Sequence, residues 1–132
     1  MLYNIKTGYN GFPRKPMEDI IILISSLHKL KADEITFVFS DRHAYLKTAL
    51  FSTDLKDLDR IIWPTLQARN FRKDDVDRFE KYQAEALIHK RVPLAALKGI
   101  VCYNDSVRAD MQKAADAAGA VVKVISQPNW YL

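Results

Sequence analysis

The residues best suited to chemistry lie in one short run around Glu85. Alternating polarity predicts a half-buried strand here, with alanine and isoleucine on one face and Gln83, Glu85 and His89 on the other. A fixed carboxylate at such a position can accept a hydrogen bond from a sugar hydroxyl and stabilise a positive charge that develops nearby. The simpler alternative is that these side chains form only the polar face of an edge strand.

His43 is a second candidate for chemistry. It follows a run of apolar residues that predicts a buried strand, and it falls in the predicted first turn of a helix. Ligands commonly bind where the strands of a sheet end. The positive end of a helix dipole favours a neutral imidazole over its cation. His43 could therefore hydrogen-bond a ligand without carrying charge, or it could be a partly exposed histidine with no role.

Basic residues gather between positions 69 and 91, and Phe71 and Tyr82 lie among them. This mixture suits single-stranded nucleic acid, because bases stack on aromatic rings while cations follow the backbone. Nearby acidic residues offer the alternative of an ordinary solvated surface, and on charge alone that alternative is the better interpretation. The cations in question are Arg69, Arg72, Lys73, Arg78, Lys81, Lys90 and Arg91.

Spacing argues against several other kinds of site. The four glycines, at positions 8, 11, 99 and 119, form neither of the common phosphate-binding motifs. The three histidines fall on separate predicted elements, and a single Cys102 can form neither an internal disulfide nor a cysteine-based zinc site, so no metal site is predicted. Ser40, Asp41 and His43 are too close together in one turn to converge as a catalytic relay.

Composition is that of an ordinary globular protein. The 132 residues are 48% hydrophobic and 27% charged, which predicts one domain with a real core. Twenty basic and sixteen acidic side chains give a net charge of +4, which permits a polyanionic partner without requiring one. No signal peptide is predicted, and the longest apolar run, residues 20–24, is far too short to span a bilayer. We therefore expect no membrane association and a cytoplasmic location.

Strands and helices are expected to mix along the chain. Besides the strand around Glu85, apolar runs predict strands over residues 19–24, 35–39, 100–103 and 121–125. The first of these is apolar on both faces and is expected to be central in its sheet. Helical segments are expected over residues 27–31, 42–51, 55–62, 94–98 and 104–118. Residues 1–5 are interpreted as a stub and residues 6–16 as an irregular loop, and residues 66–81 are expected to form a surface loop or a loose helix. This order predicts an α+β domain.

Several blocks of the sequence resemble, in order, the DarT toxins, which are bacterial enzymes that transfer ADP-ribose from NAD to a base of single-stranded DNA. The first block is Phe-Val-Phe-Ser-Asp-Arg-His-Ala-Tyr at residues 37–45. The resemblance starts at Met-Leu-Tyr, residues 1–3, and continues through residues 51–59, 63–64, 82–89, 99–103 and 128–131. Ordered blocks at compatible spacing are more specific than any single motif.

The resemblance implies a single ADP-ribosyltransferase-like domain over residues 1–132, with a mixed, split β-sheet and flanking helices. It implies NAD as co-substrate, no metal, and thymidine as the expected target base. Glu85 is implied as the catalytic glutamate, and His43 and Tyr3 as NAD-binding residues. Contacts to DNA are implied for Gln83, Arg69, Arg72, Arg78 and Lys81. The implied partners are single-stranded DNA and a macrodomain antitoxin.

Members of the family carry a further N-terminal segment ahead of the match at residues 1–3. We therefore expect an N-terminally incomplete domain that binds NAD poorly and has little activity by itself. We also expect an exposed sheet edge that favours self-association. Two alternatives remain at this point: a catalytically inactive fragment that binds DNA or an antitoxin, and a purely structural domain.

Overall fold

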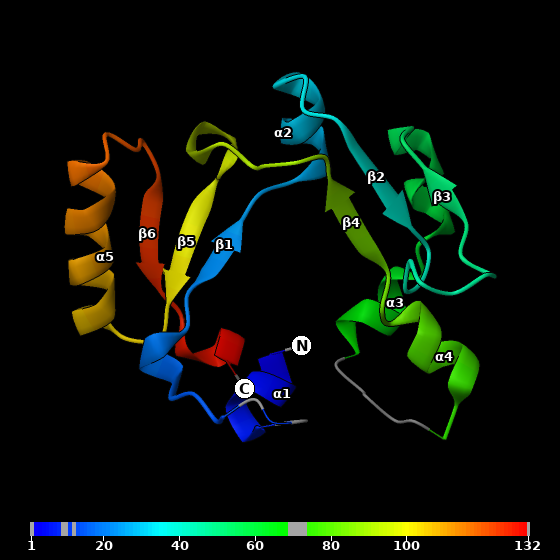
Figure 1. Cartoon of the computed structure of the whole chain (residues 1–132), viewed down its shortest axis with the longest axis horizontal. Coiled ribbons are helices and arrows are strands. Elements are labelled where there is room, and N and C mark those ends of the chain that lie inside the picture. Colours follow the sequence, from blue (N-terminus) through cyan, green and yellow to red (C-terminus); the bar gives the residue numbers. More distant parts are fainter. Residues whose placement is uncertain (1, 9–10, 12, 69–73, 132) are drawn as a thin grey trace. The chain divides into compact units, whose positions relative to one another are not determined.

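The computed structural model describes residues 2–8, 11, 13–68 and 74–131. The chain forms two compact units: unit 1 contains Met1–Ser26 and Val92–Leu132, and unit 2 contains Leu27–Arg91. Each unit has its own three-stranded sheet (Figure 1). The expected α+β class with a split sheet is confirmed. A single domain over residues 1–132 stays a prediction.

The sheet of unit 1 is mixed and has the order β1-β5-β6. Strand β1, Ile22–Ile24, pairs antiparallel with β5, Gly99–Cys102, and β5 pairs parallel with β6, Lys123–Ser126. All four residues of β5 are buried, whereas Leu23 of β1 is 57% exposed. The prediction that the first strand is central was therefore wrong. Its continuous apolar run is typical of a central strand, but β5 takes that place and β1 lies at the edge.

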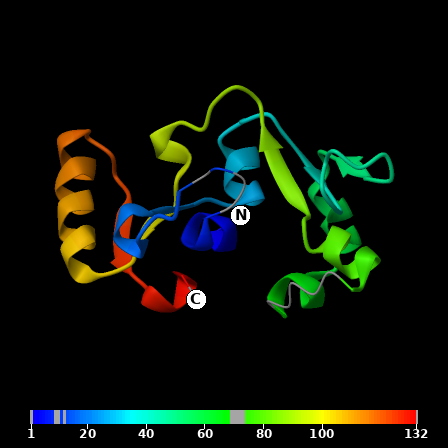
Figure 2. The same cartoon turned by 60° about the horizontal axis from the view of Figure 1, so that its bottom comes forward.

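Helix α5, Asp105–Ala117, connects the two parallel strands and lies along β6 (Figures 1 and 2). It begins as expected at Asn104, whose side-chain oxygen accepts a hydrogen bond from the Val107 N–H at 3.0 Å. After the helix, Gly119 adopts a φ of +65°, a conformation that glycine tolerates best. The apolar face of α5 buries Ala115, which clusters with Ile100, Cys102 and Val124.

The C-terminal segment of unit 1 is fixed by a buried tyrosine. Tyr131 ends the short 3₁₀ helix η4, Pro128–Tyr131, and is fully buried. Its hydroxyl lies 2.9 Å from the carbonyl oxygens of both Ile20 and Val101. Burial raises the pKa of the Tyr131 hydroxyl above its ordinary value, so the neutral form that can donate to a carbonyl is favoured.

The remaining elements of unit 1 are short. They are α1, Leu2–Thr7, and the 3₁₀ helices η1, Met17–Asp19, and η3, Leu94–Ala96. Helix α1 corrects the expectation of a stub followed by a loop from residue 6. Its six residues contain neither glycine nor proline, and the breakers that suggested a loop begin only at Gly8.

The sheet of unit 2 is antiparallel and has the order β3-β2-β4. Its strands are β2, Phe37–Ser40, β3, Phe51–Ser52, and β4, Glu85–Ile88. Ser40 lies opposite Glu85, and Phe39 lies opposite Ala86. The buried side chains of Phe37 and Phe39 anchor the central strand, β2. This pairing places Glu85 beside the point where β2 ends and the following loop begins.

The described residues of unit 2 also form four short helical segments. They are α2, Leu27–Ala32, η2, Leu55–Arg60, α3, Trp63–Gln67, and α4, Val76–Lys81. Helix α4 begins at Asp75, whose carboxylate accepts a hydrogen bond from the Arg78 N–H at 3.0 Å. This helix leads through one turn into β4. It therefore sets where Glu85 enters the sheet.

The helix expected over residues 42–51 does not form. Residues 41–50 make a turn-rich loop, called loop 41–50 below, which leads into β3. The Asp41 N–H donates to the Leu50 carbonyl at 3.2 Å, and the Asp41 carboxylate accepts from the Leu50 N–H at 2.9 Å. These two bonds close the loop at its base. They outweigh the helical spacing of its apolar residues, because Asp41 binds the far end of the segment instead of capping a helix.

Candidate active site

The centre of the site is the Glu85 carboxylate at the first residue of β4. Its Oε1 accepts a hydrogen bond from the Ala44 backbone N–H at 2.7 Å and lies 2.9 Å from His43 Nδ1. The Glu85 side chain is 35% exposed. Its other oxygen, Oε2, receives no hydrogen bond from any residue in the described ranges. The carboxylate is thus held on one side and accessible on the other.

The contact between His43 and Glu85 defines the state of the imidazole. A carboxylate oxygen only accepts, so Nδ1 must carry a hydrogen to bond with it. The Tyr45 N–H, which lies 3.3 Å from the same nitrogen, would need Nδ1 as an acceptor. The two bonds cannot form together, and the shorter bond to a charged acceptor is favoured. We therefore assign the Nδ1 hydrogen to the contact with Glu85.

The structure brings together the two residues that the sequence placed in different elements, Glu85 and His43. It also corrects the surroundings of His43, which lies in loop 41–50 and not in a helix. The argument from a helix dipole therefore does not apply to this imidazole. Its side chain is half exposed, with its Nδ1 turned to the carboxylate.

Loop 41–50 is held in place by the residues next to it. At its start, the buried Ser40 hydroxyl donates to the Arg42 carbonyl at 2.6 Å. Within the loop, the Leu46 N–H donates to the His43 carbonyl at 3.0 Å. Together with the bonds of Asp41, these contacts fix the backbone that presents the Ala44 N–H to Glu85.

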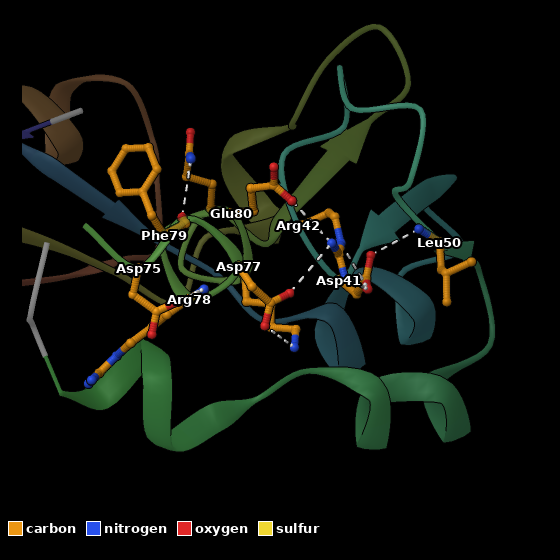
Figure 3. Close-up of polar contacts among 10 residues, drawn as sticks. Asp41, Arg42, Leu50, Asp75, Asp77, Arg78, Phe79 and Glu80 are labelled. Carbon is orange, nitrogen blue, oxygen red and sulfur yellow. Dashed lines mark hydrogen bonds and ion pairs between the residues drawn. The ribbon is translucent and has the colours of Figure 1, made fainter. Parts of the chain in front are cut away.

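Arg42 is the most heavily paired cation of the site (Figure 3). Its guanidinium contacts the Asp41 carboxylate through Nε and Nη2, each at 3.3 Å, and Glu80 Oε2 through Nη1 at 3.2 Å. Asp77 lies 3.9 Å away. The Arg42 side chain is only 16% exposed. Loop 41–50 and helix α4 are therefore joined by an ion-pair network beside Glu85.

Asp77 also takes part in a second ion pair. Lys81 Nζ lies 2.6 Å from Asp77 Oδ2, one turn along α4. The hydrogen bond from Lys81 is the largest cause that lowers the pKa of Asp77 below its ordinary value. Desolvation opposes it, and the charges of Lys81 and Arg42 add smaller lowering effects. Asp77 therefore stays ionised to a lower pH than a free aspartate.

Gln83 lies in the turn before β4, not on the strand as expected. Its side-chain amide donates to the Phe79 carbonyl at 3.2 Å, and its backbone N–H donates to the Glu80 carbonyl at 3.0 Å. The bonds that end helix α4 remove it from the strand, so alternation does not place it on a face with Glu85. His89, at the far end, lies just beyond β4 and is exposed.

The predicted DNA-binding cations are not equally described. Arg69 and Arg72 lie outside the described residues. Arg78 is half buried, and its Nε has no hydrogen-bond partner within the described part of the chain. Lys81 is paired with Asp77. The structure therefore places Lys81 in a local ion pair, and it buries the Arg78 Nε without a hydrogen-bond partner among the described residues.

Tyr3, the other residue expected to bind NAD, belongs to unit 1. The structure describes its backbone, in helix α1, and not its side chain. Its proposed role therefore stays a prediction.

A small apolar recess of about 170 Å³ adjoins Glu85 within unit 2. Phe39 and Ala86, which lie opposite each other in the sheet, form part of its wall, and so does Trp63 from α3. Among the described residues that line it, Glu85 is the charged one. A flat ring can be accommodated beside a carboxylate in such a recess.

Two kinds of feature are absent from the described ranges. No three His, Cys, Asp or Glu residues in those ranges are grouped so that they could hold a metal ion. In the same ranges, no helix has the length and apolar character needed to cross a bilayer.

Sequence reasoning missed the Ala44 N–H and Arg42. A backbone donor leaves no trace in residue identity, so no signal could have found it. Arg42 had a weak signal: it lies between Asp41 and His43, directly after a buried strand. Asp77 and Glu80, three residues apart, share a face of the predicted charged segment.

Comparison with known proteins identifies relatives that share one name. A DNA ADP-ribosyl transferase of Escherichia coli O127:H6 is 43% identical over 133 residues, which cover 99% of this chain and 61% of the relative. One from Thermus sp. (strain 2.9) is 34% identical over 113 residues, covering 86% of this chain and 53% of the relative. The chain thus spans between half and two thirds of these relatives.

Comparison with solved structures agrees with the sequence comparison. The structure of Thermus sp. 2.9 DarT in complex with ADP-ribosylated ssDNA matches with a TM-score of 0.90 at 30% identity, covering 99% of this chain and 63% of that one. The same protein in complex with NAD+ matches with a TM-score of 0.86, covering 99% and 66%. A family model described as "ssDNA thymidine ADP-ribosyltransferase, DarT" matches residues 1–132. Because that match extends over the whole chain, the chain belongs to the DarT family.

Proposed function

We propose that this chain carries the catalytic carboxylate of an enzyme that transfers ADP-ribose from NAD to a thymidine base of single-stranded DNA. The observation that carries the proposal is the Glu85 carboxylate, held through Oε1 by the Ala44 N–H and close to His43 Nδ1. The family membership and the NAD- and DNA-bound Thermus DarT structures support the choice of substrates.

The proposed role of Glu85 is electrostatic. Breaking the bond between nicotinamide and ribose leaves positive charge on the ribose carbon, and the bond electrons leave with nicotinamide. Glu85 Oε2 is placed to accept a hydrogen bond from a ribose hydroxyl and to stabilise this charge. Because Oε1 is already held, the carboxylate needs little reorganisation during the reaction. Removing one such preorganised group typically costs about a hundredfold to a thousandfold in rate.

His43 is proposed to help with the proton. When a ring nitrogen of the base attacks the ribose carbon, that nitrogen must lose its hydrogen. Glu85 can accept this hydrogen directly. His43, whose Nδ1 hydrogen is bonded to Glu85 Oε1, then holds the carboxylate in place while the proton is transferred.

The basic residues and the partners are proposed from the resemblance. Arg78 is a proposed DNA contact on this ground, and so are Arg69 and Arg72, which lie outside the described residues. For Gln83 we propose a contact to the base, which would require its present bond to Phe79 to be exchanged. NAD is the proposed co-substrate, and His43 and Tyr3 its proposed further contacts. A macrodomain antitoxin is the proposed protein partner, in keeping with the toxin–antitoxin pairing of the family.

The test uses a chimera in which this chain replaces the matching segment of the E. coli relative. The chimera and the unaltered relative are incubated with labelled NAD and two single-stranded oligonucleotides, one with a single thymidine and one with none. We expect the chimera to label only the thymidine-containing oligonucleotide. An unlabelled oligonucleotide, with the unaltered relative active alongside, would contradict the proposed function.

A further inference from the structure

We propose that Arg42 is a positioning residue that locks loop 41–50 to helix α4, so that His43 and the Ala44 N–H stay on the Glu85 carboxylate. The proposal deepens the proposed function and rests on it for the catalytic consequence. Its structural content stands on contacts within unit 2 alone.

The guanidinium of Arg42 joins two segments that are far apart in sequence. Its Nε and Nη2 donate to the Asp41 carboxylate at the base of the loop. Its Nη1 donates to Glu80 in α4, 38 residues later (Figure 3). The side chains of Arg42 and Asp41 are 16% and 11% exposed, and that of Glu80 is 27% exposed. An isolated ion pair on the surface contributes little to stability. This pair belongs to a half-buried network, in which two nitrogens of the guanidinium contact Asp41 and a third contacts Glu80.

The positions along the chain explain why this link matters to Glu85. Arg42 is adjacent to His43 and two residues before Ala44, the two groups that contact Glu85 Oε1. Glu80, its partner, lies in the helix that leads into β4. Both sides of the contact around Oε1 are therefore attached, within a few residues, to the same guanidinium.

Arginine is required by the geometry of its partners. A guanidinium presents five donors in a planar fork, so that it can serve Asp41 and Glu80 at once, whereas a lysine ammonium is a compact point charge. Without the guanidinium, Asp41 and Glu80 would face each other as uncompensated carboxylates, with Asp77 nearby. Their repulsion would favour movement of loop 41–50 away from α4.

A second effect of the cation is electrostatic. Three carboxylates beside a site for a polyanion would repel it, and Arg42 offsets part of their charge. A lysine at position 42 would restore the positive charge but would not contact Asp41 and Glu80 at once. Comparing Gln and Lys at position 42 therefore separates the positioning effect from the charge effect.

The structural test is nitrogen NMR of the His43 ring in the 132-residue chain. The variant Glu85→Gln gives the signal of an imidazole that has lost its carboxylate. We expect Arg42→Gln to move the His43 Nδ1 signal most of the way to that reference, and Arg42→Lys to move it part of the way. Arg60→Gln is the matched control, because Arg60 is half exposed and its ion-pair partner among the described residues is Asp57 in the same 3₁₀ helix.

The backbone amide spectrum shows whether each variant is folded. If Arg42→Gln unfolds, Arg42→Lys carries the test. A folded variant at position 42 that keeps the wild-type His43 signal would overturn the proposal. Loop 41–50 would then stay in place without the contacts of the guanidinium with Asp41 and Glu80. Neither result depends on enzymatic activity.

The catalytic consequence is measured in the chimera. We expect Arg42→Gln to lower kcat by on the order of tenfold to a hundredfold, with little change in the KM for NAD, since the reacting groups are misplaced while the substrate-binding surface is kept. Arg42→Lys should recover part of kcat, and Arg60→Gln should match wild type. Full recovery by lysine would assign Arg42 to charge and not to position. An inactive wild-type chimera would refute the proposed function, while the NMR result would still decide the role of Arg42.

Discussion

The sheets of unit 1 and unit 2 each have three strands, but different interactions hold their central features in place. In unit 1, the buried strand β5 is covered by α5, and the buried apolar side chains include Ile100, Ala115 and Val124. In unit 2, Glu85 lies at a strand end and is held by loop 41–50 through a backbone N–H and an imidazole. Apolar burial is nondirectional and tolerant, whereas polar contacts fix single atoms. The apolar core of unit 1 thus stabilises its sheet, whereas the polar contacts in this part of unit 2 fix the position of one carboxylate.

The largest effect is expected at Glu85. In the chimera, Glu85→Gln keeps the shape of the side chain and removes its charge, so transfer to thymidine should fall at least about a hundredfold. The free energy of unfolding should change little, since the side chain is partly exposed. Glu18→Gln, on an exposed residue of unit 1, is the control and should transfer at the wild-type rate. Equal rates for the two variants would remove Glu85 from the mechanism.

His43 should show a smaller loss of activity. Because His43→Gln removes the imidazole beside Glu85 but leaves the carboxylate and the Ala44 N–H, we expect a loss of about tenfold to a hundredfold in kcat. His28→Gln, on an exposed residue of α2, is the matched control. An unchanged kcat for His43→Gln would make His43 only a neighbour of the site.

The core of unit 1 should respond in stability. Val101→Ala opens a cavity at a fully buried position and should lower the free energy of unfolding by on the order of 2 kcal/mol. Val121 is fully exposed, so the same substitution there should stay within about 0.5 kcal/mol of wild type. Urea unfolding of both variants checks this. Comparable losses at the two positions would show that burial does not govern the stability of unit 1.

The sequence predicts more of unit 1 than of unit 2, because apolar burial leaves a local pattern in the sequence and polar contacts between distant residues do not. Helix α5 and β5 were predicted nearly in full, since apolar periodicity and the Asn104 cap are local signals. Loop 41–50 was wrongly expected to be helical, because its shape depends on bonds between Asp41 and Leu50 that spacing does not reveal. Glu85 and His43 were identified as candidates by residue type, and their contact required the pairing of β2 with β4. Arg42 was missed, since its partners lie in α4.

A change in DNA affinity is expected from the basic segment. Replacing Arg69, Arg72 and Arg78 together with glutamine should weaken binding to a single-stranded oligonucleotide. If each contacts one phosphate, the slope of log affinity against log salt should fall by about 2. Fluorescence anisotropy of the chimera over a series of salt concentrations measures this. An unchanged slope would show that these arginines form only a solvated surface.

The smallest effect concerns the pair between Lys81 and Asp77. Because the pKa of Asp77 is lowered, the pair stabilises the fold above the ordinary value of 3.8. This contribution is lost as the pH falls through the lowered pKa. Lys81→Gln should therefore lower the Tm slightly at pH 7 and leave it unchanged at a pH below both values. Lys56→Gln, on an exposed lysine, should have no such pH-dependent effect. A difference that persists in acid would assign the role of Lys81 to packing.

The most direct test of the central claim is a double-mutant cycle between His43 and Glu85 in the chimera. The claim is that loop 41–50 acts through the Glu85 carboxylate as one catalytic unit. Single-turnover transfer to a thymidine-containing oligonucleotide is measured for wild type, each single variant to glutamine and the double variant. Residues that act as a unit are strongly non-additive, so we expect the double variant to be no slower than Glu85→Gln alone. Losses that multiply would show that His43 and Glu85 act independently and would contradict the account.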